Sequence, residues 1–304
     1  KYGKYKGSQR YKCNSYNRTF IASTGTAIGM IKKKREFLAC QDLMLTGNYM
    51  SLVKTAAKIG VSAQTVFSWR HKILLSMPKQ TAKFEGESEM DDLWMLYSQK
   101  GRKGLGYSRK RGGSKQKGDN GFQVKVLAVA DSEHVELKVT NIGRISQTDI
   151  QRTVGDRFTK NSTIYSDKHQ SIAAFAKNTK IKHVSFIASE HTVDGKGVQL
   201  VNNIAERLKS MVNRTFRGVS TKYLQMYADW FKTKENFKQK VEDRSVFQKA
   251  MFTDHNSWNV YSNIENIYER FIKNHSERTY RCPVKNRYKS VNWNGEVITD
   301  FAYI

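Results

Sequence analysis

The 304-residue chain has little cysteine, only two prolines and half as many acids as bases, and each shortage excludes a class of protein. Its three cysteines, Cys13, Cys40 and Cys282, are too few and too scattered for a disulfide framework, which indicates a reducing compartment. No apolar run approaches the roughly 18 residues of a membrane span, and no signal peptide is recognisable. We therefore expect a soluble cytoplasmic protein without a membrane partner.

What the chain does contain is positive charge, with 53 Lys and Arg against 27 Asp and Glu, a formal net charge of +26. Hydrophobic residues make up 38% of the chain and aromatic residues 12%, enough to build cores. Such a basic folded chain indicates a polyanionic partner, because each phosphate contact releases condensed counterions. Nucleic acid is the interpretation we favour, although charge alone also allows an anionic membrane or a ribosomal setting.

Residues 1–30 form a short basic, aromatic and turn-rich segment. The stretch RYKCNSYNRTF has the rhythm of a β-ribbon knuckle that would normally carry a C-x-x-C pair, but Tyr16 stands three residues after Cys13. Zinc needs four sulfur or nitrogen ligands, and no second Cys or His occurs in this segment. We expect a degenerate, zinc-ribbon-like segment and do not expect structural zinc in this chain.

Residues 31–77 are predicted to form an all-α helix-turn-helix domain, with three helices between Lys34 and Leu75. SLVKTAAKIG has a helical apolar stripe, Gly60 supplies a tight turn, and Ser62 is a natural N-cap for the next helix. The second helix of such a motif lies in the DNA major groove. The apolar stripe consists of Leu52, Val53, Ala56, Ala57 and Ile59, and Val66, Trp69 and Ile73 are expected to face the core. The residues expected to face outward and reach bases or phosphates are Gln64, Thr65, Ser68, Arg70 and Lys72.

Residues 84–240 are predicted to form an α/β domain after a linker that starts at Pro78. The first segment reads as a strand that carries acidic residues, and the next two show the alternation of strands. Helices then alternate with two further strands. The expected strands are 88–97, 122–130, 134–142, 162–166 and 183–188, and the expected helices are 147–158, 169–177, 199–216 and 221–237. This order matches an RNase H-like fold, a mixed five-stranded sheet with flanking helices.

Two segments stand apart from these elements. Residues 98–118 contain eight Lys and Arg and no acid, and we expect a mobile connector whose Arg109, Lys110 and Arg111 touch phosphates. Residues 241–304 form a C-terminal extension to which we assign no role, although 262–274 has a helical pattern.

Phosphodiester chemistry requires divalent metals held by oxygen ligands that converge from separate elements. Asp91 lies in the first strand and Asp167 at the end of the fourth, and the two carboxylates can face each other if these strands are neighbours. Asn202, Glu206 and Lys209 share one face of the helix that begins near Gln199. The chain has no P-loop and no G-x-S-x-G elbow.

These residues resemble the ISXO-type (insertion-sequence fifteen-ninety-five-like) bacterial transposases. The resemblance is collinear over most of residues 10–237, through FLACQDLMLTGNYMSLVKTAAKIGVSAQTVFSWRHKIL, GESEMDDLWMLYSQKG, SRKRGG, IYSD and VNNIAERLKSMVNRTFRGVSTKYLQMYADWF. Members of this family join a zinc ribbon and a helix-turn-helix to an RNase H-like domain with an Asp-Asp-Asn-Lys or Asp-Asp-Glu-Lys signature. The chain departs from the family at the incomplete ribbon and at Asp92, where Glu is usual.

The resemblance implies an insertion-sequence transposase that binds terminal inverted repeats, cuts the strands and joins them to target DNA. Asp91, Asp167 and Asn202 would hold magnesium or manganese, as two ions, and Lys209 would contact a phosphate near the scissile bond. Glu206 is the alternative third ligand, should the helix register differ by one turn. The implied partners are double-stranded DNA at the transposon ends and the target, in the nucleoid of a prokaryotic-type cell. Pairing two ends implies a homodimer or larger assembly on DNA.

Two other functions remain open from the sequence. The incomplete ribbon favours a domesticated or inactive relative that acts as a DNA-binding regulator or scaffold. A structure-selective nuclease with the same fold would cut DNA without joining it.

Overall fold

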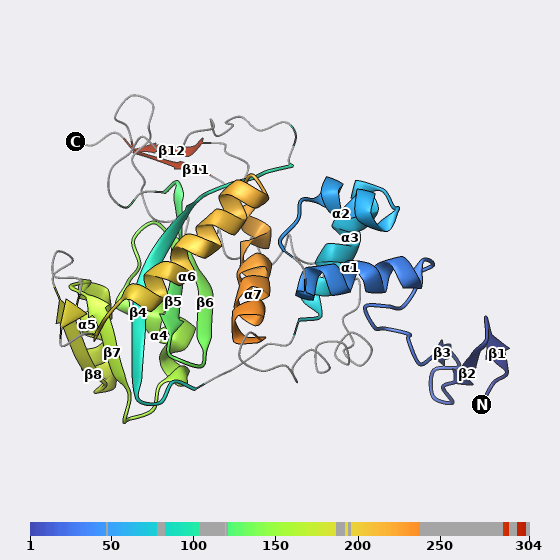
Figure 1. Cartoon of the computed structure of the whole chain (residues 1–304), viewed down its shortest axis with the longest axis horizontal. Helices are drawn as coiled ribbons and strands as arrows, with labels where there is room; N and C mark the ends of the chain where they lie inside the picture. Colours follow the sequence, from blue (N-terminus) through green and yellow to red (C-terminus); the bar gives the residue numbers. More distant parts are fainter. Residues whose placement is uncertain are drawn as a thin grey trace. The chain divides into compact units, whose positions relative to one another are not determined.

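The computed structural model describes residues 1–46, 48–77, 83–101, 103, 119, 121–186, 192–193, 196–237, 288–291 and 297–301 (Figure 1). Contacts between residues divide the chain into two compact units, formed mainly by residues 1–78 and by residues 79–239. No helix among the described residues is long and apolar enough to cross a membrane. The predicted connector at 98–118, except residues 98–101 and 103, and the predicted helix at 262–274 lie outside the described residues.

The first unit begins with a small antiparallel sheet in the order β1-β2-β3. Its strands are β1 (Lys4–Tyr5), β2 (Ser8–Lys12) and β3 (Thr19–Ile21). The expected knuckle joins β2 to β3, and the backbone N–H of Cys13 donates to the carbonyl of Arg18 at 2.8 Å. Backbone N–H groups of Tyr16 and Ser15 lower the pKa of the Cys13 thiol, because they stabilise the thiolate.

Three helices complete the first unit, as predicted: α1 (Lys34–Thr46), α2 (Leu52–Ile59) and α3 (Ala63–Leu75). Gly60 ends α2 at a φ of 70°, a left-handed conformation that glycine adopts without strain. The Ser62 hydroxyl caps α3 by accepting from the backbone N–H of Thr65. Val66, Trp69 and Ile73 are buried as predicted, and Trp69 packs edge-on against Phe37 of α1.

The apolar stripe predicted on α2 is partly wrong. Ala56 is buried, but Val53 is 70% exposed and Ala57 is also exposed. A helix of only two turns presents one narrow face to its neighbours, so these two residues fall outside it.

The second unit is built on a five-stranded mixed sheet with the order β6-β5-β4-β7-β8, which fits an RNase H-like fold. β4, β5 and β6 are antiparallel neighbours, whereas β4–β7 and β7–β8 are parallel pairs. The predicted neighbourhood of the first and fourth strands is therefore confirmed. The strands are β4 (Glu87–Leu96), β5 (Gln123–Ala130), β6 (Val135–Ile142), β7 (Thr163–Asp167) and β8 (Lys182–Phe186).

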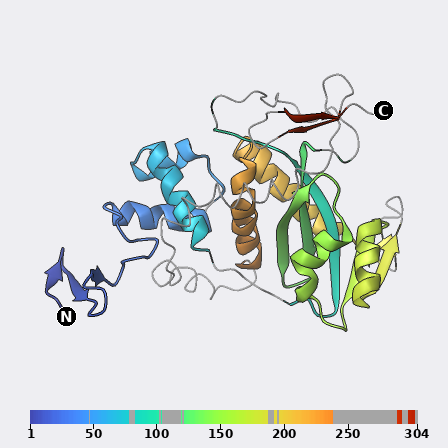
Figure 2. The ribbon, with the colours of Figure 1, turned by 180° about the vertical axis from the view of Figure 1, so that it is seen from behind.

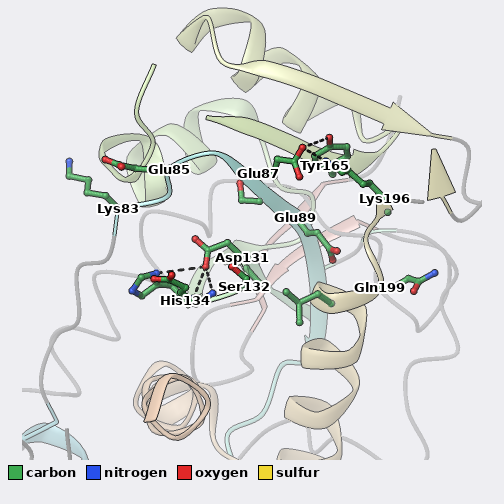
Figure 3. Close-up of a pocket in the computed structure, with 15 residues that line it drawn as sticks. Lys83, Glu85, Glu87, Glu89, Asp131, Ser132, His134, Tyr165, Lys196 and Gln199 are labelled. Carbon is green, nitrogen blue, oxygen red and sulfur yellow. Dashed lines mark hydrogen bonds and ion pairs between the residues drawn. The ribbon is translucent and has the colours of Figure 1, made fainter. Parts of the chain in front are cut away.

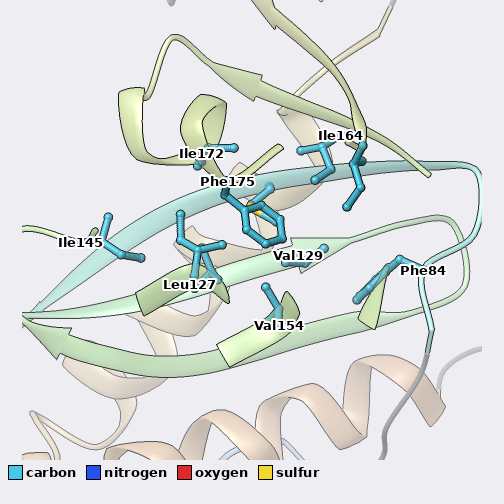
Figure 4. Close-up of a cluster of buried hydrophobic side chains, with 11 residues drawn as sticks. Phe84, Leu127, Val129, Ile145, Val154, Ile164, Ile172 and Phe175 are labelled. Carbon is cyan, nitrogen blue, oxygen red and sulfur yellow. The ribbon is translucent and has the colours of Figure 1, made fainter. Parts of the chain in front are cut away.

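Helices α4 (Gln147–Val154) and α5 (Gln170–Thr179) cover one face of this sheet, as the view from behind shows (Figure 2). A 3₁₀ turn, Gly155–Arg157, follows α4, so the α-helix is shorter than the predicted 147–158. The main apolar core lies between these helices and the sheet (Figure 4). It contains Phe84, Met90, Leu127, Val129, Ile145, Ile150, Val154, Ile164, Ile172, Phe175 and Ile181.

Helix α6 (Gln199–Ser210) packs on β4 and β5, and α7 (Thr221–Phe237) covers the edge of β6. The amide of Gln225 in α7 accepts from the N–H of Val139 and donates to the carbonyl of Leu137, which satisfies this sheet edge. Helix α6 was predicted to continue to Phe216, but its end widens into a π-helix, Met211–Thr215. The wide turn brings the Phe216 ring against Tyr227 and Trp230 of α7.

Two short antiparallel pairs are also described. β9 (Thr192–Val193) pairs with β10 (Lys196–Gly197), and β11 (Tyr288–Val291) pairs with β12 (Val297–Phe301).

Candidate active site

Asp91 and Asp167 lie on adjacent parallel strands, on the same face of the sheet. In the register of β4 and β7, Glu89 is paired with Tyr165. Asp91 and Asp167 each follow two residues later, and side chains two residues apart on a strand point to the same side. The structure thus brings together two carboxylates that are 76 positions apart in the sequence.

Burial and mutual repulsion dominate the electrostatics of this pair, although the backbone N–H of Asp92 and the Lys125 cation favour the charged form of Asp91. Burial raises the pKa of Asp91 to about 7, with further contributions from the carboxylate of Asp167 and from Asp92. The Oδ1 atom of Asp167 is buried without a hydrogen-bond partner. Asp91 accepts from the backbone N–H of Asp92 at 2.7 Å. Two half-buried carboxylates, one with an unpartnered oxygen, fit a divalent cation, since a cation would offset the cost of removing their charge from water.

Asp92, although next in sequence, belongs to the opposite face of the sheet. Its carboxylate pairs with the ammonium of Lys125 at 2.7 Å, and Lys125 also pairs with Asp119 at 2.8 Å. Lys125 lies opposite Trp94 on β5 and therefore shares a face with Asp92. The pleat of β4 thus separates the two neighbouring aspartates, and only Asp91 faces Asp167.

Glu89 anchors the start of α6 beside the aspartates, a role that the sequence analysis missed. Helix α6 has no side-chain cap of its own at Val198, and the Oε2 atom of Glu89 accepts from the backbone N–H of Val201 at 2.8 Å. A carboxylate at a helix N-terminus also complements the helix dipole. The available sequence signal was an acid two residues before Asp91, on the same strand face.

Helix α6 presents its predicted site residues on the flank that faces β7. Val201, Ile204 and Leu208 are buried toward the sheet. On one flank, Arg207 pairs with Glu235 of α7 at 2.6 Å, and α7 covers the β6 edge. Asn202, Glu206 and Lys209 occupy the opposite flank, which in this strand order is the flank toward β7.

These three side chains do not contact the aspartates in the described part of the structure. Asn202 is exposed, and no hydrogen bond joins its side chain to Asp91 or Asp167. Glu206 is 73% exposed and pairs with Lys209 at 2.9 Å, which lowers the pKa of Glu206. Among the described residues, no three His, Cys, Asp or Glu side chains gather in a metal-binding cluster. Among the described side chains, the structure therefore brings none of the three residues predicted on α6 into hydrogen-bond contact with the two aspartates.

The residues predicted to read DNA have different environments. Gln64 of α3 is exposed, whereas Thr65, Ser68 and Lys72 are partly buried. Burial lowers the pKa of Lys72. Arg109, Lys110 and Arg111 lie outside the described residues.

Arg70 corrects one prediction, because it does not face outward. Its side chain is 1% exposed and donates to the carbonyl of Met50 at 2.9 Å and to the hydroxyl of Thr55 at 3.2 Å. The guanidinium thus joins α3 to the start of α2. Residue type alone did not reveal that this long charged side chain is buried where α2 and α3 meet.

An acidic hollow of about 750 Å³ lies at the start of β4 and is lined by Glu89, which is two residues from Asp91 on the same strand face (Figure 3). Neither Asp91 nor Asp167 lines it. Glu87 pairs there with Lys196 and accepts from the hydroxyl of Tyr165 at 3.1 Å. The other acids in its wall are Glu85, Glu89, Asp131 and Glu133. So many carboxylates repel phosphate, so we expect polyanions to avoid this hollow.

The chain is similar to sequences of transposable elements over most of its length. Residues 83–236 match the family model described as ISXO2-like transposase domain. An "Uncharacterized protein in transposable element ISH50" of Halobacterium salinarum is 27% identical over 262 residues, 82% of this chain and 83% of that protein. Two solved structures show a remote likeness at 12% identity. The pre-cleavage Mos1 transpososome has a TM-score of 0.30, over 73% of this chain and 80% of that chain. The Mos1 strand transfer complex has a TM-score of 0.31, over 73% and 79%.

Proposed function

The chain belongs to the ISXO2-like transposase family, and from this premise we propose that it cuts the ends of its own insertion sequence and joins them to target DNA. The observation that carries the proposal is the half-buried pair of Asp91 and Asp167 on one sheet face, in which burial and mutual repulsion raise the pKa of Asp91 and the Oδ1 atom of Asp167 has no hydrogen-bond partner. Two carboxylates side by side on one sheet face supply oxygen ligands of the kind that hold the metals of phosphodiester chemistry.

In this proposal, Asp91 and Asp167 hold Mg²⁺ or Mn²⁺, with the Asn202 amide oxygen as a neutral third ligand. Bound metal would activate the attacking oxygen and stabilise the leaving oxygen. Glu89 fixes the start of α6 and so positions the flank that carries Asn202. Lys209 contacts a phosphate near the scissile bond after leaving Glu206, and Glu206 is the alternative third ligand.

Two successive reactions would use the same site. In the first, water attacks a phosphodiester at the transposon end, and the bond to the 3′ oxygen breaks to leave a free 3′-hydroxyl. In the second, that hydroxyl attacks a phosphodiester of target DNA, so one P–O bond forms and another breaks. Double-stranded DNA would be held by α3, with Gln64 as its most exposed candidate contact.

The test is strand cleavage and joining by the purified chain, with DNA that carries the ends flanking its own gene. We expect Asp167→Asn to abolish both reactions while DNA binding is retained. Asp156→Asn is the matched control, because Asp156 lies in the same unit and is 79% exposed. In the same assay, Asn202→Ala should remove activity and Glu206→Ala should spare it; the reverse would identify Glu206 as the ligand.

Two results would contradict the proposal. Binding without metal-dependent cutting by the unmodified chain would favour a DNA-binding regulator. Cutting without joining would favour a nuclease.

A further inference from the structure

The N-terminal sheet exposes aromatic rings that are not packed in a hydrophobic core. Within residues 1–25, all of which the structure describes, no side chain is buried. Exposed aromatic surface of this kind usually marks an interaction site. The exposed rings are Tyr2 (46%), Tyr5 (49%), Tyr11 (37%), Tyr16 (79%) and Phe20 (43%).

The rings lie on both faces of the sheet. Tyr11 on β2 lies directly opposite Phe20 on β3, and their rings stack with centroids 5.5 Å apart at an angle of 23°. On the other face, two cations approach the Tyr2 ring, with Arg10 at 5.1 Å and Lys12 at 5.3 Å from its centroid. The stacked pair of rings and the two cations thus lie on opposite faces of one small sheet.

The positive charge of this segment indicates which kind of partner it binds. Residues 1–35 contain ten Lys and Arg, and the first acid in the chain is Glu36. Tyr, Phe and Arg are also common at protein–protein interfaces, but lysine is depleted there, and cations without any acid favour a polyanion over a protein. A polyanion with flat groups suits it well, because phosphates meet the cations and bases stack on the rings.

Base faces are accessible only where DNA is unpaired, since a duplex stacks each base on its neighbours. We propose that the β1–β3 sheet binds unpaired nucleotides, with Tyr11 and Phe20 stacking on bases on one face, and with Arg10 and Lys12 meeting phosphates where the same strand passes the other face. The proposal goes beyond the cutting and joining reactions, which need only Asp91, Asp167 and α6.

The first test compares binding of a fluorescent oligo-dT single strand and of a blunt duplex by the full chain. Tyr11→Ile together with Phe20→Val keeps residues that favour strands but removes both π-faces. We expect single-strand affinity to fall on the order of tenfold per ring, with duplex affinity and the salt dependence unchanged. Arg10→Gln together with Lys12→Gln should instead weaken both ligands and flatten the salt dependence.

The second test uses the unmodified chain and does not depend on whether a variant folds. Oligo-dT substituted with 5-iodouracil, crosslinked by light, should attach to peptides that contain Tyr11 or Phe20. Equal loss of single-strand and duplex binding, no loss at all, or crosslinks found only outside residues 1–25 would each overturn the proposal. Because both tests measure binding, they are independent of whether the chain cuts DNA.

Discussion

At the scale of single residues, the site depends on which way each side chain points. Asp91 and Asp92 are neighbours in sequence but lie on opposite faces of β4, one beside Asp167 and one paired with Lys125. Their environments differ for that reason, since Lys125 neutralises Asp92 while Asp91 faces another carboxylate.

This difference predicts how stability depends on pH without metal. The pKa of Asp91 is about 7 in the folded chain, against 3.8 ordinarily, so the folded state keeps a proton that the unfolded state releases between these values. The free energy of unfolding in EDTA should therefore fall as pH rises from about 4 to 7, by on the order of 4 kcal/mol.

Urea denaturation across this pH range measures the effect, and Asp91→Asn should remove most of the slope. Added Mg²⁺ should restore stability at pH 7 in the unmodified chain but not in the variant. Parallel slopes for the two proteins would contradict the assignment of the charge to Asp91.

At the scale of elements, the start of α6 is held by a side chain from strand β4, because the helix has no side-chain cap of its own. The Glu89 carboxylate supplies the acceptor at its start, and Arg207 ties its far flank to α7 through Glu235. The helix is therefore fixed at two points, and the flank that carries Asn202 is directed toward β7.

Removing the first of these anchors should loosen the helix. We expect Glu89→Ala to lower the free energy of unfolding by about 1–2 kcal/mol, because buried N–H groups lose their acceptor. DNA cleavage should fall as well, since Asn202 follows Val201 directly. Glu89→Gln, which retains an acceptor oxygen, should recover most of the stability, whereas Glu85→Ala in the neighbouring hollow should change neither quantity. Equal effects of Glu89→Ala and Glu85→Ala would argue against the anchor.

At the scale of the whole molecule, the dominant property is a net charge of +26 that is distributed unevenly. Residues 1–35 and 98–118 contain Lys and Arg but no Asp or Glu. The hollow at the start of β4, in contrast, is lined by several carboxylates. Such a distribution directs phosphates to some surfaces and away from others.

Binding to duplex DNA should consequently be strongly salt-dependent. With about six or more phosphate contacts, the logarithm of the affinity should fall with the logarithm of salt concentration with a slope of about −5 or steeper. Replacing the eight Lys and Arg of residues 98–118 by Gln should flatten that slope, measured by fluorescence anisotropy. An unchanged slope would show that this segment does not touch DNA.

Much of the architecture could be predicted from the sequence because it depends on local chemistry. Ser62 and Gly60 delimit helices through their own backbone preferences, and alternating apolar residues marked β5 and β6. The limits of α7 were predicted to the residue, 221–237. Errors arose where neighbours rather than local pattern decide, as at the exposed Val53 and at the π-helix after α6.

By itself, the sequence determined the order of the elements, the basic character of the chain and the resemblance to its family. Only the tertiary structure decided that Asp91 faces Asp167 while Asp92 does not, that Glu89 holds α6, and that Arg70 is buried between α2 and α3. Each of these depends on strand register or on packing between segments that are distant in the chain. Register and packing are set by the whole sheet and its helices at once, so no local window of sequence contains them.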